Sequence, residues 1–116
     1  MPMIRIQTSI AIDEEKQDGL MNTLSSAVAE LLGKPESYMM IILEPETIMM
    51  MSGTAEAAAL VEVRSVGSIS EEESKNLSGK ISEILGQEIA VGAGRIYLNF
   101  QGVPGTMWGF DGRTFG

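Results

Sequence analysis

The chain has 116 residues, 44% hydrophobic and 21% charged, which is typical of one folded domain spanning residues 1–116. Its net charge is −8 and no basic stripe is present, so we expect no nucleic-acid partner. It contains no cysteine and no histidine, which excludes disulfides, thiol nucleophiles, Ser-His triads and most transition-metal sites.

The first half of the chain predicts a strand, a helix and a second strand. Residues 3–9 alternate between apolar and polar side chains, as in a half-buried strand. Asp13 precedes a stretch with apolar residues at helical spacing, which Gly33 ends. Residues 39–43 are continuously apolar, which is typical of a strand buried on both faces, and residues 48–51 predict a further short strand.

The second half repeats this plan. Residues 58–66 predict a strand, and Ser70 begins a helix through a capping box, with Gly86 near its expected end. Residues 96–100 predict the last strand. Residues 102–116 are glycine-rich yet carry several large apolar side chains, so we expect this tail to pack against another part of the protein.

This order predicts an α+β fold, a pseudo-duplicated β-α-β unit with a four-stranded mixed sheet and two helices. Two helices cover only one face of such a sheet. The apolar strands at residues 39–43 and 96–100 then need cover on the other face, so we expect a homo-oligomer. No run of about 18 apolar residues and no leader pattern is present, so we expect a cytoplasmic protein without a membrane partner, secreted only by a non-classical route.

Pro2 is the first candidate for chemistry. If the initiator Met1 is removed, the chain begins with a secondary amine, and an α-amino group has a pKa of about 8. Burial beside a cation lowers that pKa toward neutrality, because both effects disfavour the ammonium form. The alternative is that a small residue at this position only permits removal of Met1.

Other candidates are equally ambiguous on their own. Lys34 follows the first helix, either as a solvated cation at its C-terminal end or as a partner for a substrate carboxylate. Tyr38 suits a pocket wall or a subunit interface. Tyr97 and Asn99 lie two apart in a strand and share a face that needs a polar partner or a ligand. Val66 ends a strand where an unpaired N–H is expected to point into a cleft.

Together these residues resemble the macrophage migration inhibitory factor (tautomerase) family over nearly the whole chain. The matching motifs are Pro2, Asp18-Gly19, Gly33-Lys34-Pro35 with Tyr38, Gly53 with Glu56, Ser65-Val66-Gly67, the run from Arg95 to Phe100, and Thr114-Phe115. The resemblance implies a homotrimer with the three sheets inside. It also implies keto–enol tautomerisation of aryl-pyruvates such as phenylpyruvate, and of dopachrome-like compounds, without a cofactor.

The resemblance also implies a role for each residue. Pro2 is the catalytic base, and Lys34 binds the substrate carboxylate with the Val66 N–H. Tyr97 and Asn99 reach the pocket from a neighbouring subunit, so each site lies between chains. The expected walls are Met3, Tyr38, Trp108, Phe110 and Phe115. Trp108 stands where an aliphatic residue is usual and Phe110 where tryptophan is usual, so the substrate preference is expected to differ.

Two other classes of protein fit parts of the sequence. The family includes receptor-binding cytokines, so the chain is alternatively a signalling protein with incidental catalysis, although nothing in it names a receptor. A Pro2→Gly variant separates these functions, because surface contacts survive it and tautomerisation does not. The same β-α-β-β-α-β order occurs in RNA-recognition motifs, but the acidic charge and the missing aromatic-basic signature oppose that interpretation.

Overall fold

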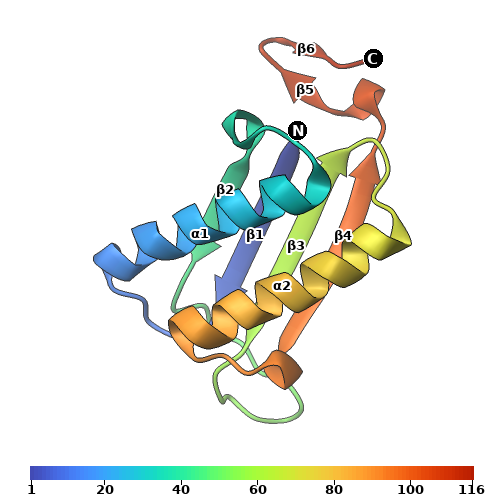
Figure 1. Ribbon diagram of the computed structural model, residues 1–116. Coiled ribbons are helices and arrows are strands. Elements are labelled where there is room, and N and C mark those ends of the chain that lie inside the picture. Colours follow the sequence, from blue (N-terminus) through green and yellow to red (C-terminus); the bar gives the residue numbers. More distant parts are fainter.

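A four-stranded sheet and two long helices form two layers in the computed structural model, which describes residues 1–116 (Figure 1). The strands are β1 (Pro2–Thr8), β2 (Met40–Glu44), β3 (Ala59–Val66) and β4 (Ile96–Val103), in the spatial order β2-β1-β3-β4. β1 is parallel to β2 and antiparallel to β3, and β3 is parallel to β4. The two β-α-β units and the mixed sheet confirm the predicted architecture of the single chain.

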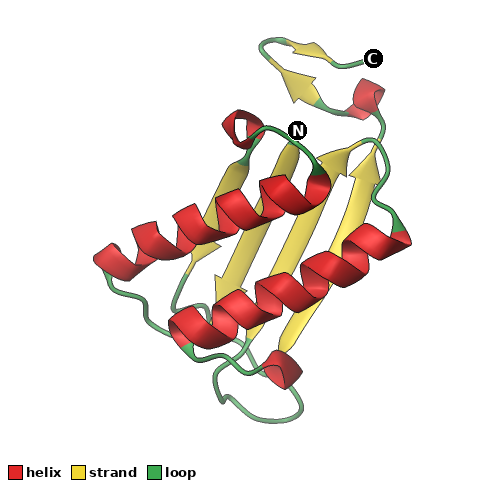
Figure 2. Ribbon diagram, viewed as in Figure 1, coloured by secondary structure: helices red, strands yellow, loops and turns green.

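Both long helices lie on the same face of the sheet (Figure 2). Helix α1 (Glu14–Leu32) begins where the Asp13 side chain accepts a hydrogen bond from the Lys16 N–H at 2.9 Å. Helix α2 (Glu71–Ile89) begins with the predicted capping box, in which Ser70 and Glu73 exchange hydrogen bonds of 3.0 and 2.9 Å. These side chains satisfy backbone N–H groups that a helix start leaves unpaired. Neither helix carries an apolar stretch long enough to cross a membrane.

The core lies between the helices and the face of the sheet that they cover. Most of its fully buried side chains come from the long elements other than β2 and β4: Ile4 and Ile6 of β1, Val61 and Val63 of β3, Leu20, Leu24 and Val28 of α1, and Leu77, Ile81 and Leu85 of α2. Burying each such side chain contributes about 1.5–3 kcal/mol. This layer holds the strands in place and so positions the ends of β1 and β3.

The opposite face of the sheet has no cover within the chain. On β2, Met40 and Ile42 remain 58% and 36% exposed, and Tyr97 of β4 is 67% exposed. Residues 39–43 are therefore covered on one face only in the single chain, because both helices lie on one side, and burial of their other face stays a prediction for the assembled protein.

Two local predictions are wrong. Residues 48–51 form no strand: Ile48 is fully exposed, and only an isolated bridge joins Met51 to Thr54. Helix α2 does not end at Gly86, because Ile89 and Val91 are also buried and packing continues the helix for another turn.

The C-terminal tail forms a small hairpin beyond one end of the sheet, the end at which the N-terminus lies (Figure 1). Strands β5 (Gly109–Phe110) and β6 (Arg113–Thr114) pair through Asp111 and Gly112, whose φ angles are 53° and 78°. Positive φ at both positions matches the two-residue turn for which Asp-Gly is strongly preferred. The hairpin places the tail's aromatic side chains near the chain's first residue.

Candidate active site

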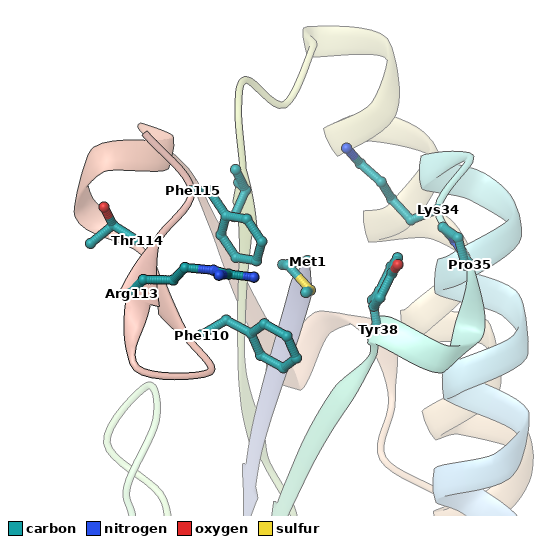
Figure 3. A pocket seen from close by; sticks show the side chains of 9 residues that line it. Met1, Lys34, Pro35, Tyr38, Phe110, Arg113, Thr114 and Phe115 are labelled. Atoms are coloured by element: carbon teal, nitrogen blue, oxygen red, sulfur yellow. The ribbon is translucent and has the colours of Figure 1, made fainter.

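A cavity of about 460 Å³ opens between the N-terminus, the end of α1 and the C-terminal hairpin (Figure 3). Nine residues line it: Met1, Lys34, Pro35, Tyr38, Val66, Phe110, Arg113, Thr114 and Phe115. Five of the predicted site residues are in this set. The lining contains no aspartate or glutamate, although the whole chain carries a net charge of −8.

Lys34 reaches the cavity because of the way in which α1 ends. Gly33 adopts a left-handed conformation with φ 63°, and its N–H and that of Lys34 close the last turn on the carbonyls of Glu30 and Ala29. Glycine suits this position because it takes positive φ at little cost. The chain then turns into Pro35, and the Lys34 side chain extends over the cavity (Figure 3). The helix end therefore fixes a cation at this wall.

The amino terminus lies in the same cavity. Burial, and in second place the positive charge of Lys34, lower the pKa of the Met1 amino group below its ordinary value. Both causes act against the ammonium form. Pro2 follows as a buried residue at the start of β1, where its missing N–H costs no ladder hydrogen bond. The fold therefore places the terminal nitrogen where its pKa is reduced.

The Val66 N–H is not free in the chain that carries Met1. It donates a hydrogen bond of 3.2 Å to the carbonyl oxygen of Met1, while the next amide, that of Gly67, donates to Val103 at 2.8 Å. The prediction of an unpaired N–H at this strand end is thus wrong for the full chain. The physical reason is that Met1 extends β1 by one residue alongside β3.

Aromatic side chains form the outer wall of the cavity. The Phe110 and Phe115 rings are stacked, with centroids 5.9 Å apart and planes inclined by 9°. The Phe115 N–H donates hydrogen bonds to the Gly105 and Trp108 carbonyls at 3.0 and 3.2 Å, which hold the chain end against the hairpin. Stacked rings of this kind offer an apolar surface to a flat ligand.

A second cavity of about 330 Å³ adjoins the first and shares Met1, Tyr38 and Phe110 with it. Pro2, Met3 and Trp108 also line this second cavity. Eight of the ten predicted site residues therefore gather around the N-terminus, from both ends of the sequence and from the end of α1.

Tyr97 and Asn99 are not part of this group. Tyr97 pairs with Leu60, whereas Pro2 pairs with Ser65 at the other end of β3, roughly 17 Å further along the strand. Both side chains project from the open face of the sheet, and Tyr97 lines a different cavity beside the loop at residues 47–52. Within one chain the predicted site is divided between two places.

Sequence reasoning did not single out Arg113. The signal that could have found it is the Asp111-Gly112 dipeptide, because such a turn makes Phe110 and Arg113 direct partners in a hairpin. Figure 3 shows the Arg113 side chain extending from the hairpin toward Met1, from the wall opposite Lys34. The cavity thus has two cationic side chains besides the amino terminus.

This arrangement is suited to binding an organic anion and to moving a proton. Cations without acidic neighbours attract a carboxylate, apolar walls exclude water, and an amine with a lowered pKa exchanges protons near neutrality. No group of three or more acidic side chains is placed to hold a metal ion.

The fold and the cavity define a class of small two-layer α+β proteins with a terminal amine in a cation-lined pocket. Comparison with known proteins identifies the family. The macrophage migration inhibitory factor (MIF) family matches residues 1–116, and the chain belongs to this family.

Individual relatives span the same length. Macrophage migration inhibitory factor of Rattus norvegicus is 27% identical over 115 residues, which cover 99% of each chain. The crystal structure of a homologue from Prochlorococcus marinus superposes with a TM-score of 0.93 at 38% identity, over 98% of this chain and 99% of that one. The protein from Toxoplasma gondii superposes with a TM-score of 0.92 at 29% identity, over 97% and 99%. The predicted family is confirmed.

Proposed function

We propose that the chain, once Met1 is removed, is a keto–enol tautomerase of aryl-pyruvates such as phenylpyruvate, with Pro2 as its base. Dopachrome-like compounds are a second substrate class for the same proton transfer. The observation that carries the proposal is the position of the N-terminus in a cavity beside Lys34: the Met1 amine there has a lowered pKa, and removal of Met1 leaves the Pro2 amine as the new terminus at the same end of β1. Membership of the MIF/tautomerase superfamily, whose members are generally isomerases, supports it.

The chemistry needs a base near neutrality and no metal. The neutral Pro2 nitrogen takes a proton from the carbon next to the ketone, and the C–H electron pair becomes the C=C bond of the enol. The ketone oxygen gains the charge and then accepts the proton that Pro2 returns. In the other direction, Pro2 takes the enol proton and delivers it to carbon. Lys34 pairs with the substrate carboxylate and stabilises the developing negative charge.

Removal of Met1 has two consequences in this mechanism. It converts the Pro2 nitrogen from an amide, which has no basic lone pair, into an amine. It also takes away the Met1 carbonyl, to which the Val66 N–H donates in the full chain. That N–H is then available to the substrate carboxylate, together with Lys34. A retained Met1 blocks the base and one binding group at the same time.

We further propose that the active form is a homotrimer. Its sites lie between chains, and the open face of one sheet supplies Tyr97 and Asn99 to the cavity of a neighbour. Support comes from the exposed apolar side chains on that face and from the distance between Tyr97 and Pro2 within one chain. The walls of the site are Met3, Tyr38, Trp108, Phe110 and Phe115.

A Pro2→Gly variant tests the base. Glycine also permits removal of Met1, but it provides a primary amine without the ring that holds the nitrogen in place. We expect kcat/KM for phenylpyruvate tautomerisation to fall by at least about 10²-fold, the usual contribution of a general base. Pro45→Gly, at the far end of β2, is the matched control and is expected to keep its activity. Full activity in Pro2→Gly, with Met1 removal verified by intact mass, would refute Pro2 as the base.

A further inference from the structure

Arg113 is the one arginine of the chain without a partner. Arg5 pairs with Glu44 at 2.6 Å, and Arg64 lies 3.7 Å from Glu62. Arg95 donates to four backbone carbonyls that fix the loop before β3. Arg113 makes no ion pair and no side-chain hydrogen bond, yet it lines the cavity at the N-terminus.

The backbone fixes where this side chain points. The Asp111-Gly112 turn sets Phe110 and Arg113 opposite each other, and directly opposed residues of a hairpin project from the same side. Both side chains line the cavity, whereas Asp111, the nearest acidic residue in sequence, does not. The guanidinium is therefore presented to the cavity and has no carboxylate to neutralise it there.

Lys34 and Arg113 occupy different walls. Lys34 enters from the end of α1 and Arg113 from the hairpin, with Met1 between them (Figure 3). Lys34 is also the charged side chain whose field lowers the pKa of the amino group, so it is the cation at the reacting end. A substrate with a single carboxylate at Lys34 leaves Arg113 without an anion.

We infer that the preferred substrate is a 2-oxo acid with a second anionic group, which Arg113 binds at the wall opposite Lys34. The inference rests on the proposed tautomerase function. Lys34 holds the carboxylate next to the reacting ketone, the Phe110 and Phe115 rings flank the middle of the molecule, and the planar guanidinium binds a distal carboxylate through two N–H groups. An aryl-pyruvate with a carboxylate on its ring has this shape.

The test compares two inert ligands of nearly equal shape, 4-carboxycinnamate and 4-carbamoylcinnamate, which differ by one negative charge. Their binding to the Met1-free protein is measured by calorimetry at low salt. We expect the dianion to bind about tenfold more tightly, which is the scale of a charge-assisted hydrogen-bonded pair. Arg113→Gln should abolish this preference and Arg113→Lys should keep part of it. Lys16→Gln, which removes an exposed cation on α1, should leave it unchanged.

Equal affinity for the two ligands, binding of neither ligand, or a preference that survives in Arg113→Gln would overturn the inference. Turnover distinguishes this failure from a failure of the proposed function. Tautomerisation of phenylpyruvate without any preference for the dianion refutes the role of Arg113 alone. A preference for the dianion without turnover refutes the tautomerase and leaves Arg113 as a binding residue. In the active protein, 4-carboxyphenylpyruvate should lose its advantage in Arg113→Gln through KM rather than kcat.

Discussion

The two faces of the sheet differ in how far the rest of the chain covers them. On β3, Val61 and Val63 point under the helices and are fully buried, whereas Glu62 and Arg64 lie on the open face. The covered face completes its packing within one chain. The open face does not, because exposed apolar side chains are mixed there with ion pairs.

The register shows how the open face is composed. A row runs across the four strands from Ile42 through Arg5 and Glu62 to Asn99, and so combines one apolar, two charged and one polar side chain. Such a surface is compatible with water but also offers hydrogen-bonding groups and apolar area to another chain. The covered face therefore determines the fold of the single chain, and the proposed assembly uses the other face, with the cavity at the end of β1.

The substitution Ile42→Glu on the open face is expected to have the largest effect, which is to prevent assembly of the trimer. In a single chain the new carboxylate lies beside Arg5 in water, so the fold is expected to survive with an unchanged circular-dichroism spectrum. In a trimer the same charge is buried in each of three interfaces, at a cost of several kcal/mol per ion. Sedimentation should therefore show separate chains, with most activity lost.

Asn22→Glu, on the exposed side of α1, is the control and should remain assembled. A wild-type protein that sediments as single chains, or an Ile42→Glu variant that still sediments as a trimer, would contradict the role given to the open face.

The next effect is on stability, from Ile81→Ala on the covered face. Ile81 is fully buried, and removing its side chain leaves a cavity that costs about 2–5 kcal/mol in the free energy of unfolding. Urea unfolding measures this loss, with the exposed neighbour Lys80→Ala expected to change stability by less than about 0.5 kcal/mol. Equal stability of the two variants would mean that the helix layer does not hold the sheet.

The smallest effect is at the cavity, from Lys34→Gln. The charge of Lys34 lowers the pKa of the Met1 amine in the full chain, and we expect the same charge to act on the Pro2 amine once Met1 is removed. Removing that charge should therefore raise the pKa of the Pro2 amine and move the rising limb of the pH–rate profile toward higher pH. Loss of a carboxylate partner should also raise KM for phenylpyruvate roughly tenfold. Lys16→Gln should change neither quantity. A profile that stays in place or moves to lower pH would show that Lys34 does not act on the amine.

Much of the fold follows from local patterns. Short segments of the sequence are enough to predict several features of the fold. These are the alternation in β1 and β3, the helix caps at Asp13 and Ser70, and the left-handed Gly33. The segment at residues 48–51 misled because its apolar run has no neighbouring strand to pair with in the single chain, where Ile48 is fully exposed. Gly86 misled because packing of Ile89 extended the helix beyond it.

The site was only partly predictable, because some of its contacts join residues that are far apart in the sequence. Lys34, Tyr38 and the aromatic tail were found through their motifs, and the structure brings them to the N-terminus. The hydrogen bond from the Val66 N–H to Met1 depends on the register of β1 against β3, which no motif encodes. The position of Arg113 in the cavity depends on the C-terminal hairpin lying next to Met1, at the other end of the sequence. Contacts between the two ends of a chain are set by the fold as a whole.

The proposed role of the free Pro2 nitrogen as the base can be tested on two forms of the same protein. The same chain is prepared with Met1 retained and with Met1 removed, both verified by intact mass, and phenylpyruvate tautomerisation is measured for each. We expect activity in the chain that begins at Pro2 and a loss of at least about 10²-fold when Met1 is present, because the amide nitrogen is not basic and the Val66 N–H is occupied. Equal activity of the two forms would contradict this role for Pro2.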